Sequence, residues 1–296
     1  MKKFCCFGSL NIDYVYHLPH FVRPGETLAA ASLARYSGGK GLNQSIASAK
    51  AGMTVYHAGC IGAEGTFLKE KLECAGVHTE YIRLTEEKTG HAIIQVDSSG
   101  QNSILLYSGA NHALTEEDVD AALAGFDRGD IVLLQNETSC VDYIVRRTWA
   151  LGMRTALNAA PCAENLREVP LEKLEWLLVN EVEGAYLAGT GEPEEILQRL
   201  QARCPDTTVV LTLGEAGSMA ARGDTFVKTP AMPVRAVDTT AAGDTFTGYF
   251  LRCAAEGCSL EECLQLATAA SALAVTRPGA ADSIPIYEEA VAFLHE

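Results

Sequence analysis

Several common signals of function are missing from this 296-residue sequence. The G-x-x-x-x-G-K-[ST] spacing of a P-loop is absent, and the absence of G-x-G-x-x-G argues against a nicotinamide-dependent dehydrogenase. No apolar run approaches the ~18 residues of a membrane-spanning helix, and there is no internal repeat or low-complexity segment. What remains is a globular composition, with 48% hydrophobic and 21% charged residues.

Cationic residues are also scarce. The chain has 23 Lys and Arg against 38 Asp and Glu, a formal net charge of −15. This balance argues against nonspecific binding to nucleic acid or to an anionic membrane. It does not exclude a phosphorylated ligand, because backbone N–H groups and a few cations can bind a phosphate locally.

Cysteine and histidine show no metal-site spacing. The 10 cysteines include no C-x-x-C pair, and their scatter through apolar stretches is typical of buried thiols in a reducing compartment. The seven histidines show no ligand pattern, which argues against a structural zinc site. The apolar segment 4–8 is interrupted by Asn11 and Asp13 too early for a signal peptide. We therefore expect the first core strand of a cytoplasmic protein.

Strands and helices alternate along most of the chain. Short apolar runs predict buried strands at 4–8, 55–61, 131–134, 154–157, 176–179 and 208–213. The repeated order of strand and helix predicts a mostly parallel sheet flanked by helices, in a single α/β domain over 1–296. Residues 232–237 are predicted as one more short strand, and a helix is predicted over 45–51.

Turn chemistry predicts a hairpin over 89–107. Together with residues 14–37 it could form a small sheet separate from the main one. The alternative is an ordinary hairpin at the edge of the core sheet.

Polar clusters follow the predicted strands. They lie at 11–13, 135–137, 158, 180–183 and 212–217. The carboxyl ends of parallel strands meet at one edge of a sheet, so these clusters are expected to converge on one crevice. Taken singly, each could instead be a cap or a turn.

The segment Asp238-Thr239-Thr240-Ala241-Ala242-Gly243-Asp244 is predicted to open a helix with a turn of small residues. The free N–H groups of a first helical turn bind anions, and small side chains allow close approach. A bound anion would repel Asp244 unless that carboxylate takes a proton from an attacking hydroxyl. This arrangement points to phosphoryl transfer. The alternative is structural, with Asp238 as an N-cap and Asp244 as an acid that favours the helix dipole.

A second segment, Gly38-Gly39-Lys40-Gly41-Leu42-Asn43-Gln44, would let a ligand approach the backbone. Asn43 offers an amide, and Lys40 offers a cation that could alternatively be solvated on a flexible loop. The two segments resemble the C-terminal and N-terminal signatures of the ribokinase family of sugar kinases, also called the PfkB family. The resemblance extends over nearly the whole chain.

The resemblance implies a three-layer α/β sandwich with a small β-sheet lid from about 12–37 and 89–109. It implies transfer of phosphate from ATP to the primary hydroxyl of a sugar. D-ribose is the expected sugar, because both signatures and the tail after residue 276 match. Deoxyribose, fructose or a nucleoside are alternatives. A non-catalytic sugar sensor is a further alternative, against which the intact Asp244 and Gly243 argue.

The resemblance also assigns roles to residues. Asp244 would be the catalytic base, and the anion hole would comprise Ala241, Ala242 and Gly243. Sugar contacts are assigned to Asn11, Asp13, Gly39, Lys40, Asn43, Glu137 and Asp244. Nucleotide contacts are assigned to Asn180, Thr212, Gly214, Glu215, Gly217, Gly243 and Thr268.

Two ions and a dimer follow from the same resemblance. Glu183 would order Mg²⁺ through water, which suits a site with few carboxylates. A K⁺ ion would be held by the Asp238 side chain and by oxygens of Thr240, Ala274, Arg277, Gly279 and Ser283. The lid is expected to form the contact of a homodimer.

Overall fold

The computed structural model describes residues 2–295. Its larger sheet has nine strands in the order β13-β12-β11-β10-β9-β8-β1-β4-β5. Their bounds are β1 (Phe4–Phe7), β4 (Val55–Ile61), β5 (His78–Leu84), β8 (Ile131–Gln135), β9 (Arg154–Asn158), β10 (Trp176–Asn180), β11 (Thr208–Thr212), β12 (Ser218–Arg222) and β13 (Thr225–Thr229). Strand β12 runs antiparallel to β11 and β13, and the other neighbours are parallel.

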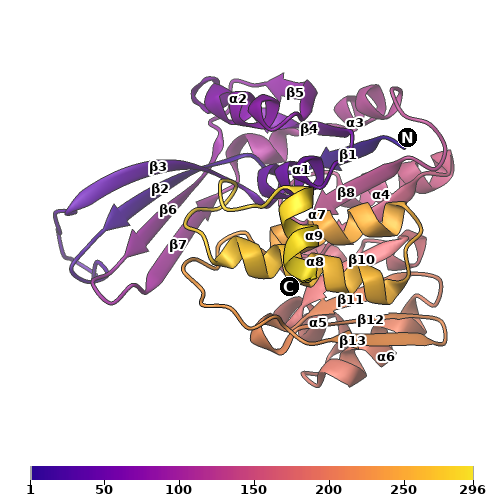
Figure 1. The fold of residues 1–296 in the computed structure, drawn as a ribbon. Coiled ribbons are helices and arrows are strands. Elements are labelled where there is room, and N and C mark those ends of the chain that lie inside the picture. The colour runs from indigo at the N-terminus through magenta and orange to yellow at the C-terminus, as the bar shows by residue number, and fades with distance from the viewer. Residues whose placement is uncertain (1, 296) are drawn as a thin grey trace.

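Helices cover both faces of this sheet (Figure 1). One face packs against α1 (Lys40–Lys50), α2 (Thr66–Cys74), α7 (Ala242–Ala255), α8 (Leu260–Val275) and α9 (Tyr287–Leu294). The other packs against α3 (Glu116–Leu123), α4 (Val141–Leu151), α5 (Glu181–Ala188) and α6 (Pro193–Arg203). Strand β1 serves both cores, since Phe4 and Cys6 face one and Cys5 and Phe7 the other. The predicted three-layer sandwich is confirmed.

Short 3-10 helices complete the chain: η1 (Ala63–Gly65), η2 (Gly109–Ala113), η3 (Glu164–Arg167), η4 (Leu171–Lys173) and η5 (Gly214–Ala216). None of the helices within residues 2–295 combines the length and the apolar character needed to cross a bilayer.

A separate four-stranded sheet projects from the body of the molecule (Figure 1). Its strand order is β3 (Ser32–Gly38), β2 (Asn11–His17), β6 (Gly90–Val96) and β7 (Asn102–Tyr107). Strands β6 and β7 pair antiparallel, as the turn between them predicts. The hairpin therefore belongs to this small sheet and is not an edge of the larger one.

Helix α1 begins at Lys40 and not at Ser45, so the predicted start is wrong. The turn into this helix is made by Gly39, which has φ 96°. A Cβ atom at Gly39 would lie 2.7 Å from the Ser9 carbonyl oxygen. Glycine at this position thus brings the first turn of α1 against the end of β1.

The prediction of a strand over 232–237 is wrong. Within residues 2–295 this segment pairs with no strand, and Pro233 has no N–H group to donate to one. At its end, Val237 N–H donates to the Val275 carbonyl oxygen at 2.7 Å. The segment instead forms one wall of a hollow beside α8.

Helices α1 and α7 pack closely enough to bring distant parts of the chain together. A Cβ atom at Gly248 would lie 2.6 Å from the Ala47 Cβ. Only glycine at this position permits the two helices to come so close. The close packing places Asp244 on α7 next to Asn43 on α1.

Candidate active site

The first turn of α7 is open to an anion. Ala241 adopts φ 61°, a left-handed conformation unusual for a residue with a side chain. Within residues 2–295, the N–H groups of Ala241, Gly243 and Asp244 have no hydrogen-bond acceptor, whereas Ala242 N–H donates to the Thr239 carbonyl oxygen at 3.2 Å. Free N–H groups at a helix N-terminus form an anion-binding site.

The Asp244 carboxylate is buried, with 7% of the residue exposed. Its Oδ2 accepts from Asn43 Nδ2 at 3.0 Å, and its Oδ1 accepts from Gln44 Nε2 at 2.9 Å. The N-cap of α7 is Ala241, so Asp238 does not cap the helix, contrary to the structural alternative. Side chains of α1 hold Asp244, which lines a cavity at the carboxyl ends of the parallel strands, called the hollow below.

A second group of acidic side chains lies beside the first turn of α1. Glu137 Oε2 accepts from Lys40 N–H at 3.2 Å and from the Ser9 hydroxyl, which in turn accepts from Gly41 N–H at 3.2 Å. Burial and the charge of Glu137 raise the pKa of Asp13 to about 6. Burial also raises the pKa of Glu137, although Lys40 opposes this shift. Two carboxyl groups and backbone N–H groups can together bind the hydroxyls of a sugar.

Asn11 begins β2 and is 4% exposed. Its Oδ1 accepts from Asn111 Nδ2 at 2.7 Å, and Asn111 Oδ1 accepts from Leu10 N–H at 2.9 Å. Asn111 thereby fixes the orientation of the Asn11 amide.

The hollow, of about 270 Å³, lies at the strand ends and is lined by Lys40, by Asp244 and by the first turn of α7. Lys40 lines it and is not a solvated cation on a loop, contrary to the alternative. Burial alone would lower the pKa of Lys40, but Asp244 and other nearby carboxylates raise it above its usual value. The hollow therefore contains a charged ammonium opposite the free N–H groups of α7.

The predicted convergence of polar clusters holds for Asn158, Asn180, Glu183 and Thr212, which all line this hollow. It does not hold for the clusters at 11–13 and 135–137, because none of their residues lines this hollow or the larger one described below. Gln135 is fully buried beneath Asp244, and Asn136 Nδ2 donates to the Pro161 carbonyl oxygen at 2.8 Å. Both side chains are withdrawn from the hollow because they satisfy interior groups.

Glu183 and Asn180 form a capping box at the start of α5. Glu183 Oε2 accepts from Asn180 N–H at 2.8 Å, and Asn180 Oδ1 accepts from Glu183 N–H at 3.0 Å. Within the described part of the chain, Glu183 Oε1 makes no hydrogen bond. This oxygen is available to a ligand in the hollow.

A larger hollow of about 550 Å³ continues from the first and is lined by the wall 231–236, η5 and α8. The predicted nucleotide contacts Thr212, Gly214, Glu215, Gly217, Gly243 and Thr268 all line it. Asn180 lines only the smaller hollow. Thr268 Oγ1 is buried without a hydrogen-bond partner in the described residues. This mostly apolar space is of a kind that takes a flat organic group.

A model of pfkB family carbohydrate kinases matches residues 1–286. The chain belongs to this family. It is 36% identical over 302 residues to the ribokinase of Haemophilus influenzae, covering 99% of this chain and 98% of the relative. It is 30% identical over 295 residues to the deoxyribokinase of Salmonella typhi, covering 95% of each. The structure of Arabidopsis thaliana ribokinase complexed with ribose and ATP is similar, with TM-score 0.88, 32% identity, and coverage of 100% of this chain and 99% of that one.

The carbohydrate kinase fold also brings Asp238 and the tail together. Asp238 Oδ1 accepts from the N–H and hydroxyl of Thr240, at 2.9 and 2.6 Å, and its Oδ2 accepts from Gly279 N–H at 2.9 Å. Burial would raise the pKa of Asp238, but these donors lower it. Nearby, Arg277 N–H donates to the Ala274 carbonyl oxygen at 3.1 Å. The Ser283 hydroxyl is buried and donates to a neighbouring carbonyl oxygen.

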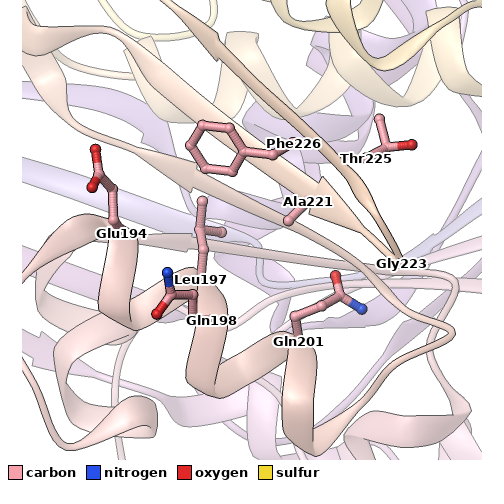
Figure 2. A pocket seen from close by; sticks show the side chains of 8 residues that line it. All are labelled: Glu194, Leu197, Gln198, Gln201, Ala221, Gly223, Thr225 and Phe226. Carbon is pink, nitrogen blue, oxygen red and sulfur yellow. The ribbon is translucent and has the colours of Figure 1, made fainter.

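Another hollow of this kinase lies between α6 and the β12–β13 hairpin (Figure 2). Figure 2 shows Leu197, Ala221 and Phe226 around it, with Glu194 as the single charged side chain. It shares no lining residue with the hollows at the strand ends. Its lining residues include no cation, so we place no chemistry there.

The sequence left several residues of the site without a role. Ser9, Gln44 and Asn111 contact predicted site residues and were not assigned. Gln135 was not assigned either, and it contacts Gln44. Gln44 lies within a motif that the sequence did single out. Gln135 lies in the predicted polar cluster at 135–137. No local pattern shows the contacts of Ser9 and Asn111, because these join segments 128 and 100 residues apart.

Proposed function

We propose that this protein is an ATP-dependent kinase that phosphorylates the primary hydroxyl of D-ribose to give ribose 5-phosphate. The observation that carries the proposal is the place of the Asp244 carboxylate. It lies at the free N–H groups of α7, between an acidic hydroxyl-binding group and a hollow that suits a nucleotide. The names of the relatives support ribose and ATP as the substrates.

In the proposed reaction, Asp244 accepts the proton of the sugar hydroxyl. The sugar oxygen then bonds to the γ-phosphorus of ATP, and the bond from this phosphorus to the β,γ-bridging oxygen breaks. ADP leaves with that electron pair. The free N–H groups of Ala241 and Gly243 donate to the oxygens of the transferred group. Ala242 N–H joins them by exchanging its bond to Thr239 for one to phosphate.

Sugar binding is assigned to the polar group beside α1. The carboxylates of Asp13 and Glu137 accept from sugar hydroxyls, and Asn11 and Asn43 offer amides. Asn43 Oδ1 is buried without a partner in the described residues, which supports a ligand hydroxyl as its donor. Gly39 lets the sugar approach the backbone, and Lys40 offers positive charge between sugar and phosphate.

The nucleotide is assigned to the larger hollow. The turn at Gly214, Glu215 and Gly217 and the face of α8 around Thr268 would enclose the base and ribose. The phosphates would extend past Thr212 and Asn180 toward α7.

The residues fit Mg²⁺ held mainly through water and phosphate. The free Oε1 of Glu183 is a hard oxygen in the hollow, and within residues 2–295 no three His, Cys, Asp or Glu side chains form a metal cluster. When bound, Mg²⁺ supplies positive charge that offsets the charge on the phosphoryl oxygens.

The residues also fit K⁺ outside the substrate pocket. The donor set consists of hard oxygens: the Asp238 carboxylate, the Ser283 hydroxyl and the carbonyls of Thr240, Ala274, Arg277 and Gly279. The hydrogen bond between Gly279 and Asp238 brings the two contributing segments together, which supports the fit. A bound K⁺ would steady the turn that precedes the anion site.

The small sheet is proposed as a lid over the sugar and as the contact of a homodimer. Asp13 of β2 aligns with Tyr36 of β3 and with Ala92 of β6, which in turn aligns with Leu106 of β7. Aligned residues point to one side of a sheet. The sugar-binding carboxylate thus shares a face with exposed apolar side chains that a second copy could cover.

The test is the rate of ADP release with ATP, Mg²⁺ and K⁺ across a panel of ribose, deoxyribose, fructose and several nucleosides. We expect the highest kcat/KM with ribose. Turnover of another compound alone would retain the kinase chemistry and reject ribose as the substrate. No turnover with any of them, together with measurable sugar binding, would support a sensor.

Deoxyribose is the second candidate, because the deoxyribokinase of Salmonella typhi is 30% identical over nearly the full length. A site that hydrogen-bonds the 2-hydroxyl rejects a sugar that lacks it, because its buried polar groups are then left unpaired. The ratio of kcat/KM for the two sugars therefore decides between these candidates.

A further inference from the structure

A row of buried amides lies beneath Asp244. Gln44 on α1 donates from Nε2 to Asp244 Oδ1 at 2.9 Å, and Gln135 at the end of β8 donates from Nε2 to Gln44 Oε1 at 2.7 Å. Both glutamines are 0% exposed. Neither lines the hollows in which the substrates are placed.

The direction of this row is set by the carboxylate. An ionised carboxylate only accepts hydrogen bonds, so Gln44 must turn its NH₂ group toward Asp244 and its oxygen toward Gln135. Gln135 must then turn its own NH₂ group toward Gln44. Its remaining oxygen points at Gly8, where a Cβ atom would lie only 2.5 Å away, and it has no hydrogen-bond partner within residues 2–295.

An unpaired buried oxygen costs free energy and therefore requires an explanation. Two apolar side chains of the same size would fill the space beneath Asp244 without leaving such an oxygen. Packing alone therefore does not account for the glutamines. The need to present one correctly oriented N–H group to Asp244 does account for both glutamines.

We propose that Gln44, aligned by Gln135, is a positioning residue that holds the Asp244 carboxylate in the orientation required to take the sugar proton. The inference rests on the proposed function of Asp244 as the base. Gln44 donates on one oxygen and Asn43 on the other, so rotation of the carboxylate is prevented from two sides. Gln44 itself exchanges no proton and touches neither substrate.

The decisive variant is Gln44→Met, which keeps the length of the side chain and removes the donor. We expect kcat to fall about 10- to 100-fold, by analogy with the loss seen when a partner that orients a metal ligand is removed. The KM values for sugar and ATP should stay at those of the parent enzyme, because Gln44 lines neither hollow. Binding of both substrates is measured separately by calorimetry.

The matched control is Gln201→Met on α6. Its amide donates to the Pro205 carbonyl oxygen at 2.7 Å, far from the strand ends, so the same substitution removes comparable hydrogen bonds. This variant should lose some thermal stability and keep the parent kcat. Gln135→Met leaves the bond from Gln44 to Asp244 in place but removes the bonds of Gln135 to Gln44 and to Cys6 Sγ, so a smaller loss of kcat is expected.

A second variant, Gln44→Glu, gives a signature that a structural role would not. The introduced carboxyl group can donate to Asp244 only when it is protonated, so kcat at saturating sugar should recover as the pH falls, unlike in the parent enzyme. Lys40, Glu137 and Cys6 interact electrostatically with Asp244, and Glu183 lines the same hollow. All four are the same in the parent enzyme.

The outcomes separate the two proposals. Parent-like kcat in Gln44→Met, or equal losses of kcat in Gln44→Met and Gln201→Met, would overturn the positioning role while leaving the kinase function intact. A parent enzyme without turnover on any sugar would overturn the proposed function and this inference with it.

Discussion

At the scale of the residue, the proposed role of Asp13 in sugar binding implies a pH dependence. Burial and the charge of Glu137 raise its pKa to about 6 in the free protein, above the usual value of 3.8. Between these two values the folded protein binds an extra proton, so its stability decreases as the pH rises through this window. A sugar whose hydroxyls donate to the Asp13 carboxylate would bind the ionised form of Asp13. Below a pH of about 6, binding would therefore require Asp13 to lose its proton.

We therefore expect the KM for ribose to rise as the pH falls below about 6, approaching tenfold per pH unit for a single proton. The measurement is KM against pH at saturating ATP. In the control Asp13→Asn, KM should be high and should lose this dependence. A KM for the parent enzyme that stays constant between pH 5 and 7 would contradict the assignment.

The roles of single residues could be predicted only where a motif brings its parts together in sequence. The turn before Asp244 is contiguous, so the anion site and its neighbouring carboxylate can be inferred from the amino-acid sequence alone. Ser9, Gln44 and Gln135 act through contacts between separate elements. A glutamine gives no local sign of whether its amide faces solvent or a buried carboxylate.

At the scale of the element, the loop before α7 and the tail after α8 work as one unit. Asp238 links them through Thr240 and Gly279. The position of this loop determines the position of the first turn of α7 and thus of the free N–H groups. A cation held between the two segments would act on the rate without touching the sugar.

Replacing K⁺ with tetramethylammonium is accordingly expected to lower kcat about tenfold, equivalent to about 1.4 kcal/mol of transition-state stabilisation. The KM for ribose should change little. The measurement is initial rate against K⁺ concentration at constant ionic strength. The initial rate of the Asp238→Asn variant should depend only weakly on K⁺. A parent rate that does not change with K⁺ concentration would contradict the proposed site.

The sequence predicts most elements to within a few residues because buried parallel strands have a distinct apolar pattern. It fails where tertiary contacts decide. The segment 232–237 has the composition of a strand but pairs with no strand in the described part of the chain, and it forms a wall of the larger hollow instead. Helix α1 starts earlier than predicted because Gly39 turns the chain directly into it.

At the scale of the whole molecule, the small sheet exposes apolar side chains beside the sugar site. On the face that bears Asp13, Tyr36, Ile104 and Leu106 are 56%, 58% and 45% exposed. A soluble monomer seldom leaves so many large apolar side chains together on one face. Pairing of two copies through this face would cover them and shield both sugar sites.

We expect Ile104→Lys to prevent formation of the proposed dimer and to raise the KM for ribose. The measurement is sedimentation velocity combined with kinetics. Leu105→Lys is the matched control, since Leu105 lies on the opposite face of the same strand and is 67% exposed. Equal behaviour of the two variants would contradict a dimer formed through the Asp13 face.

The central claim is that Asp244 is the base of a sugar kinase, and Asp244→Asn tests it most directly. The change keeps the shape of the side chain and removes its ability to take a proton. The measurement is the rate of ADP formation with ribose and ATP, with sugar and ATP binding measured on the same samples. We predict a loss of about 10²- to 10⁴-fold in kcat with both substrates still bound. Turnover close to that of the parent enzyme would contradict the account.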